Sequence, residues 1–185
     1  MKKILCLVLV VFLCTACTSS KELVDYPELN KVVNEFVEEL KESKYFEDIN
    51  YSSIDEFSFD NGEKGYDVFY ETNCSKMTLS YDEDFDFAWM MIKKNEVCNS
   101  NNSFSEFVWQ EQVNYILSLE EFTINESKFP GSTGNTWEDY KEHMMGKGDN
   151  LLITTNDGIM VSYDPSKYLF YIAKDKLLEE LDVML

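Results

Sequence analysis

Apolar residues recur at helical spacing near the start of the chain and predict an amphipathic helix over residues 27–43. Their spacing of three and four residues matches one face of a helix with 3.6 residues per turn. Pro27 suits the first turn, because its missing N–H would have no intrahelical partner there. We expect this stripe to belong to the core and the intervening glutamates to face solvent. The stripe consists of Leu29, Val32, Val33, Phe36, Val37 and Leu40.

From residue 54 the period changes to two, which predicts an antiparallel meander of four strands over 54–93. Successive side chains of a strand point to opposite faces, so alternation of apolar and polar residues is typical of a half-buried sheet. Turn-forming residues at 60–62 and 82–84 separate the strands. The alternating apolar residues are Phe57 and Phe59, then Tyr66, Val68 and Tyr70, then Met77, Leu79 and Tyr81, and finally Phe85, Phe87, Trp89 and Met91.

The second half repeats this order of a helix followed by strands. Ser103 and Glu106 have the spacing of a capping box, which predicts a helix over 104–120. Its expected apolar stripe consists of Phe104, Val108, Tyr115 and Leu119, and Phe107 and Ile116 widen this face. Trp109 and Val113 lie partly off the stripe, so burial on more than one side is expected. The remaining elements expected are a short helix at 137–145, strands at 151–155, 159–163 and 168–173 with a hairpin turn at 156–158, and a closing helix around 177–181.

This order of elements predicts an α+β fold, with antiparallel β-sheet meanders packed against two or three helices. No low-complexity linker divides the chain, and its 185 residues fall within the usual size of one domain. We therefore expect a single domain with one hydrophobic core.

The N-terminal segment has the features of an export signal. Lys2 and Lys3 form a positive region, residues 4–13 are apolar, and small Ala16 precedes Cys17. The apolar run is about half the roughly 20 residues that a membrane-spanning helix requires. Residues 13–17 resemble the lipobox of a bacterial lipoprotein, and secretion without a lipid is the alternative.

The resemblance to lipoproteins implies the maturation and location of the protein. A signal peptide at 1–16 would be removed, and Cys17 would receive a lipid with acyl chains such as palmitate. Residues 17–24 would form a lipidated tether, and residues 25–185 would form a domain on the outer, extracytoplasmic face of the cell membrane.

Composition excludes some partners. The formal net charge is −19, and all 16 basic residues are lysines. Nucleic-acid binding requires basic groups that neutralise phosphates, so this class of partner is excluded. The acidity has two interpretations: solubility outside the cell, or attraction of a basic protein partner.

Two cysteines remain after Cys17 and the signal segment are set aside. Cys74 and Cys98 form an even pair in an oxidising compartment, which predicts one disulfide. Two unbonded thiols are the alternative. A zinc site is not expected, because such sites use four ligands and the chain has a single histidine.

The sequence contains no convincing catalytic or cofactor motif. A calcium loop starting at Asp82 would need glycine at its sixth place and glutamate at its twelfth, where the chain has Phe87 and Lys93. His143 lies in no recognisable catalytic motif. We expect no enzyme activity, no metal and no cofactor.

The two acidic turns of the first meander are the predicted partner-binding surface. They extend over 60–67 and 82–86, and a protein partner, basic or a toxin, is expected to meet them. Their acidic residues are Asp60, Glu63, Asp82, Glu83, Asp84 and Asp86.

The anchor, the acidity and the layout together resemble the TipC-like immunity lipoproteins of Gram-positive bacteria. The resemblance is one of size, location and element order. It implies a non-enzymatic protein that neutralises an antibacterial toxin delivered by type VII secretion. The alternative is a lipoprotein that binds a small ligand or maintains the envelope, with an apolar pocket along the strand at 85–91.

Overall fold

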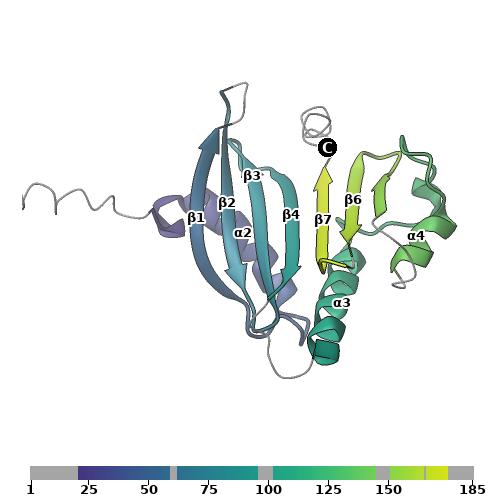
Figure 1. Ribbon diagram of the computed structural model, residues 1–185. Coiled ribbons are helices and arrows are strands. Elements are labelled where there is room, and N and C mark those ends of the chain that lie inside the picture. The colour runs from purple at the N-terminus through teal and green to yellow at the C-terminus, as the bar shows by residue number, and fades with distance from the viewer. Residues whose placement is uncertain (1–20, 59–61, 96–101, 145–150, 165, 175–185) are drawn as a thin grey trace, which may run out of the picture.

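The fold is α+β in a single domain, as the sequence predicts (Figure 1). The structure is a computed structural model that describes residues 21–58, 62–95, 102–144, 151–164 and 166–174. The closing helix expected around 177–181, together with Cys17, Phe59, Asp60 and Cys98, lies outside these residues. The elements are η1 Leu23–Asp25, α2 Pro27–Leu40, β1 Asn50–Ser58, β2 Lys64–Glu71, β3 Ser75–Asp82, β4 Phe87–Lys94, α3 Asn102–Ser118, η2 Glu126–Lys128, α4 Trp137–Met144, β5 Leu151–Thr154, β6 Ile159–Asp164 and β7 Leu169–Lys174.

The two predicted meanders join into one antiparallel sheet. Its strand order is β1-β2-β3-β4-β7-β6-β5, so β4 and β7 pair although α3, α4 and two strands separate them in the chain. Residues 89–93 of β4 lie opposite residues 169–173 of β7. The first meander therefore does not end in a free edge on the β4 side.

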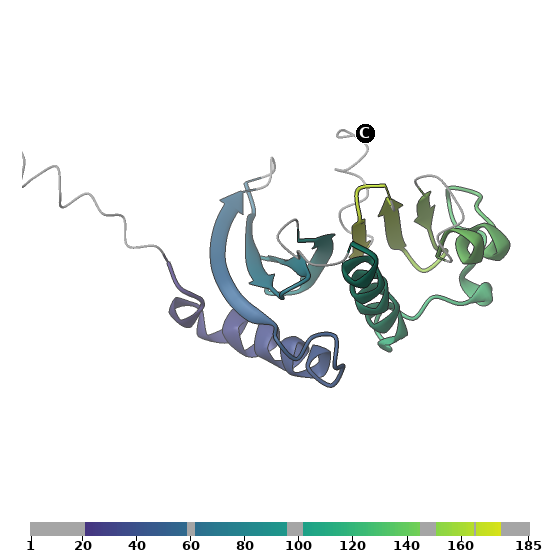
Figure 2. The same ribbon diagram turned by 60° about the horizontal axis from the view of Figure 1, so that its bottom comes forward.

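Helices α2 and α3 lie on the same side of the sheet, and α4 lies beyond the edge strand β5 (Figures 1 and 2). The apolar stripe of α2 is confirmed as core, because Leu29, Val33, Val37 and Leu40 are buried. Val32 is the exception, with 38% of its surface exposed. The strand residues facing the helices include Val68, Leu79, Met90, Ile92, Val161, Phe170 and Ile172, all buried.

Trp109 fixes α3 to the junction of the two meanders. Its ring stacks on Tyr163 of β6 at 5.6 Å and meets Tyr168 edge-on at 5.8 Å. The indole Nε1 donates to the backbone oxygen of Ile92 in β4 over 3.4 Å. The buried Trp109 side chain thus contacts both meanders, and its indole N–H has a hydrogen-bond acceptor.

The predicted stripe of α3 is wrong at Phe104 and right at Ile116 and Leu119, and the buried face extends to Trp109 and Val113, which the pattern placed partly off the stripe. Phe104 is 60% exposed, and the buried helical positions are Trp109, Gln112, Val113 and Ile116. The residues that pack against α3 determine which of its sides is buried. Gln112 Nε2 donates to the backbone oxygen of Tyr45 over 2.7 Å and to Thr72 Oγ1 over 3.3 Å, so a polar position faces inward.

The predicted start of β4 is also wrong. Phe85 lies in the preceding turn with φ of 64°, and the strand begins at Phe87. A register shift at Ser80/Tyr81 places Tyr81 opposite Phe87 and Ser80 opposite Trp89. This irregularity moves Ala88, Met90 and Ile92 to buried positions. Tyr168 likewise lies in a turn, with φ of 48°, before β7 begins.

Two valines of α3 test which side of the helix is buried. Val113→Ala removes a fully buried side chain and should lower the free energy of unfolding by roughly 2 kcal/mol. Val108→Ala, at a half-buried position of the predicted stripe, should lower it by less than about 1 kcal/mol. Urea unfolding measures both. An equal or reversed order would contradict the observed packing.

Candidate functional site

The structure brings the two acidic turns to the same end of the sheet. The strand ends that flank these turns lie side by side there, with Gly65 of β2 opposite Asp82 of β3 in the ladder. Of the predicted binding residues, Asp60 lies outside the described part of the chain. Glu63, Glu83, Asp84 and Asp86 are exposed, and Asp82 is partly buried. We call this surface the acidic end.

Asp82 shapes its own turn. Its Oδ1 accepts hydrogen bonds from the backbone N–H groups of Asp84 at 3.0 Å and Asp86 at 2.9 Å. Phe85, in the left-handed region, packs on Tyr66 with ring centroids 5.5 Å apart. Among the described residues, the side chains of Glu83, Asp84 and Asp86 have no lysine partner. These three carboxylates are therefore the accessible charges of the turn.

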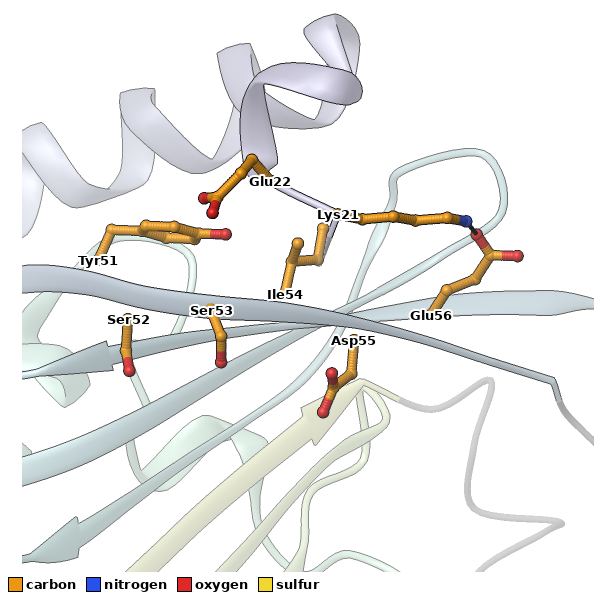
Figure 3. A pocket seen from close by; sticks show the side chains of 8 residues that line it. All are labelled: Lys21, Glu22, Tyr51, Ser52, Ser53, Ile54, Asp55 and Glu56. Carbon is orange, nitrogen blue, oxygen red and sulfur yellow. Dashed lines mark hydrogen bonds and ion pairs between the residues drawn. The ribbon is translucent and has the colours of Figure 1, made fainter. Parts of the chain in front are cut away.

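A hollow of about 490 Å³ lies along the edge strand β1, and its lining includes residues that point to either face of the sheet (Figure 3). Glu56 Oε2 accepts a hydrogen bond from Lys21 Nζ at 2.5 Å, and Glu56 Oε1 accepts one from Lys64 Nζ at 2.9 Å. These bonds, that to Lys21 first, lower the pKa of Glu56 to about 2. Tyr26 also donates to Glu56 Oε2. Lys21, Tyr26, Lys64 and Glu56 satisfy one another, which favours a structural role for this cluster in holding the start of the chain against β1.

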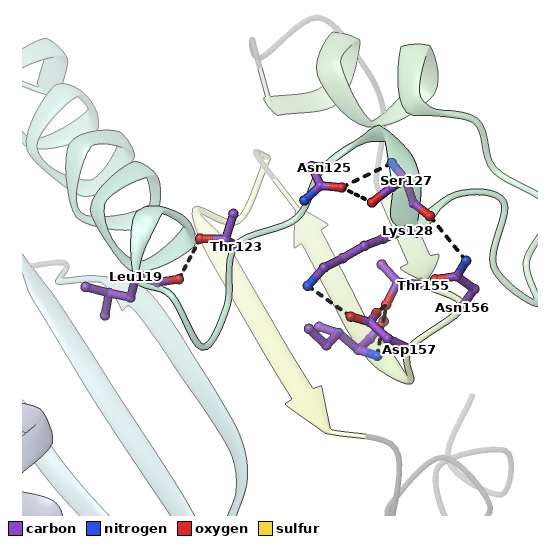
Figure 4. A network of polar contacts seen from close by, with 9 residues as sticks. Leu119, Thr123, Asn125, Ser127, Lys128, Thr155, Asn156 and Asp157 are labelled. Carbon is purple, nitrogen blue, oxygen red and sulfur yellow. Dashed lines mark hydrogen bonds and ion pairs between the residues drawn. The ribbon is translucent and has the colours of Figure 1, made fainter.

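A second polar network ties the β5–β6 hairpin to the segment before α4 (Figure 4). Lys128 Nζ pairs with Asp157 Oδ2 at 2.9 Å, and Asn156 N donates to the backbone oxygen of Lys128 over 3.0 Å. Gly158, with φ of 82°, completes the predicted hairpin turn. Each residue drawn takes part in at least one hydrogen bond or ion pair with another, so this network also stabilises structure.

The turn-rich loop after Pro130 covers the outer edge of β5. Asn135 Nδ2 donates to the backbone oxygen of Leu152 over 2.6 Å, and Thr133 N donates to Thr154 Oγ1 over 3.1 Å. A Cβ atom on Gly131 would lie 1.5 Å from the Thr154 backbone oxygen, so only glycine fits there. The loop protects an edge strand from pairing with other chains.

The predicted disulfide has only one cysteine in the described residues. Cys74 is buried just before β3, and Asn95 N donates to the backbone oxygen of Cys74 over 2.7 Å. Asn95 is thus the ladder neighbour of Cys74, while Cys98 comes three positions later in the sequence. The disulfide stays a prediction.

The face of the sheet opposite α2 and α3 carries no helix among the described residues (Figure 2). We call it the open face. Figure 3 shows Asp55 pointing to this face, away from Ile54 and Glu56. The register places one row across four strands: Asp55 opposite Asp67, Asp67 opposite Ser80, and Ser80 opposite Trp89. Because side chains in directly opposite positions share a face, these four side chains are neighbours.

Two polar atoms of this row are buried without a well-oriented partner. Asp67 Oδ1 and Ser80 Oγ have no partner at good hydrogen-bond geometry, although the two side chains lie close to each other, and Ser80 is fully buried. Burial raises the pKa of Asp67, the nearby Ser80 hydroxyl offsets this in part, and the charge of Asp55 raises it further. No described lysine pairs with Asp55 or Asp67. The sequence analysis missed this row, since only strand pairing brings it together.

An aromatic pair continues the open face beyond Ser80. Trp89 and Tyr171 stack with centroids 5.5 Å apart and planes at 30°. Burial, and then the charge of Asp67, raises the pKa of Tyr171 well above its ordinary value. Phe87 instead packs against Tyr81 and Phe122 on the helix side. The aromatic residues of this strand are therefore divided between two faces and do not line one apolar pocket.

The described residues around His143 form no catalytic arrangement and no metal-ligand cluster. The ring Nδ1 of His143 lies 2.7 Å from the backbone oxygen of Asp139 within α4. Across the described ranges, no three metal-ligating side chains come together. No described helix is both long and apolar enough to cross a membrane.

Comparison of the chain with protein-family models, curated proteins and solved structures gave no match. The arguments about function therefore rest on the residues and their geometry.

Asp67→Asn should stabilise the protein at neutral pH. Because the pKa of Asp67 is higher in the folded than in the unfolded protein, its ionisation destabilises the fold. This loss of stability begins as the pH rises above 3.8, the ordinary aspartate pKa, and is complete above the folded-state pKa. Removing the charge and its repulsion with Asp55 should raise the free energy of unfolding by up to about 1 kcal/mol. Urea unfolding of both proteins at several pH values measures this, and the difference should vanish at low pH.

Asp84→Asn, in the exposed turn, is the matched control. It should change stability by less than about 0.5 kcal/mol. A loss of stability in Asp67→Asn at neutral pH would show that the charge is needed by the fold.

Proposed function

We propose that the protein is a membrane-anchored extracytoplasmic lipoprotein that binds another protein and performs no catalysis. Its specific form is an immunity protein that neutralises a secreted antibacterial toxin. The observation that carries the proposal is the gathering of Glu83, Asp84 and Asp86, exposed and without a described lysine partner, at one end of the sheet.

Charge favours a basic protein as the partner. With a net charge of −19, the chain repels anionic surfaces and attracts cationic ones, which raises the rate of encounter with a basic partner. An acidic end held on a rigid sheet presents these charges in a fixed arrangement. A lipid at Cys17 would keep the domain at the outer membrane surface, where a toxin arriving from another cell would meet it.

The anchor is tested by Cys17→Ser. In cells fed a palmitate analogue, the wild-type chain should be labelled and sediment with membranes. Cys17→Ser should lose the label and appear in the soluble fraction, because the thioether cannot form. Labelling that persists in the variant would contradict the anchor.

Capture is tested with the mature chain carrying Cys17→Ser, used as bait in the secreted fraction of the producing strain. We expect one basic protein to be retained at low salt and released at high salt, since exposed charges are screened. A bait combining Glu83→Gln, Asp84→Asn and Asp86→Asn should retain less than about a tenth as much.

The matched control neutralises three exposed glutamates on and just after α2: Glu35→Gln, Glu39→Gln and Glu42→Gln. The net charge changes equally, so retention by this bait should stay near the wild-type level. Equal losses in both triple variants would indicate attraction by net charge without a defined site. Absence of any retained protein would contradict the capture function.

A further inference from the structure

Two features of the row Asp55–Asp67–Ser80 lower the stability of the folded protein when nothing is bound to it. Two aspartates face each other across β1 and β2, and like charges in directly opposite positions destabilise a sheet. Asp67 Oδ1 and Ser80 Oγ are buried without partners at good hydrogen-bond geometry, and such atoms cost free energy. A bound cation that donates hydrogen bonds would remove both penalties.

The composition of the row selects the kind of cation. Two carboxylates and a hydroxyl are too few for calcium, which takes six to eight oxygen ligands. A guanidinium group suits the row better, because it presents five N–H donors in one plane and stacks on aromatic rings. The Trp89–Tyr171 pair, adjacent to Ser80, supplies such rings.

The chain cannot provide this cation from its described residues. It contains no arginine. Lys21 and Lys64 are bound to Glu56, which points to the helix-facing side, and Lys76 pairs with Glu71 at 3.4 Å. Lys93 shares the open face but lies opposite Lys76, four residues along β4 from Trp89. A guanidinium at the row must therefore come from another molecule.

We propose that the open face binds an arginine side chain of the captured protein. Its guanidinium lies between Asp55 and Asp67 and donates to their carboxylates, while its stem crosses Trp89. The inference rests on the proposed capture function, and it adds a specific contact outside the acidic end, whose exposed charges serve encounter.

Nuclear magnetic resonance titration of the mature Cys17→Ser chain with Nα-acetyl-arginine amide tests the site. We expect saturable shifts of the Trp89 indole and of the Asp67 and Ser80 amides. The citrulline analogue, which has the same shape without the charge, should leave these signals unchanged. Equal shifts with citrulline, or stronger shifts with calcium at lower concentration, would overturn the assignment of a guanidinium site.

Asp67→Asn should weaken binding of the arginine probe about tenfold or more, as expected for loss of a charge-assisted hydrogen bond. Glu35→Gln, at an exposed position of α2 away from both proposed binding surfaces, should leave it unchanged. Because Asp67→Asn is expected to be at least as stable as the wild type, unfolding would not explain the loss. Unaltered binding in Asp67→Asn would place the arginine elsewhere and contradict the proposal.

The two proposals can fail separately. Suppose that the wild-type bait and the Asp67→Asn bait capture a protein equally and that the arginine probe does not bind. The proposed arginine site is then contradicted, while the capture function is supported. If the probe binds at the row but no protein is captured, the site stands and the capture function is wrong.

Discussion

The pairing of β4 with β7 is the contact on which the rest of the structure depends. It joins two meanders, distant in the chain, into one sheet. It also creates the surface on which α3 lies, since Trp109 contacts β4 through Ile92 and β6 through Tyr163. Without this pairing, each meander would expose a strand edge and the apolar side of α3 would have no complete surface to bury against.

The joined sheet has two unlike faces, and the difference follows from strand geometry. Every second residue faces α2 and α3, and apart from Glu56 near the end of β1 these positions are mostly apolar and buried. The other positions form the open face, where Asp55, Asp67 and Ser80 lie in one row with Trp89. An antiparallel sheet needs only one covered face to be stable. The open face is therefore free to carry groups that do not favour folding, which is a property typical of binding surfaces.

Charge is used in two ways in this molecule. Where a carboxylate has a structural role it is paired: Glu56 binds two lysines, and Asp157 binds Lys128. At the acidic end and in the row on the open face, Asp84, Asp86 and Asp67 lack such a partner among the described residues. The contrast separates charges that stabilise the fold from charges that are available to a cationic partner.

The sequence by itself determined the elements, because periodicity records which side of a helix or strand is buried. It predicted α2, the four-strand meander and the hairpin at 156–158, and it identified the two acidic turns. Local pattern did not predict the whole buried side of α3, since a buried Gln112 looks polar until Tyr45 and Thr72 lie beside it. It also could not show that Asp55 faces Asp67 or that Ser80 is buried. Only tertiary structure decided these features, because strand register and edge pairing depend on residues far apart in the chain.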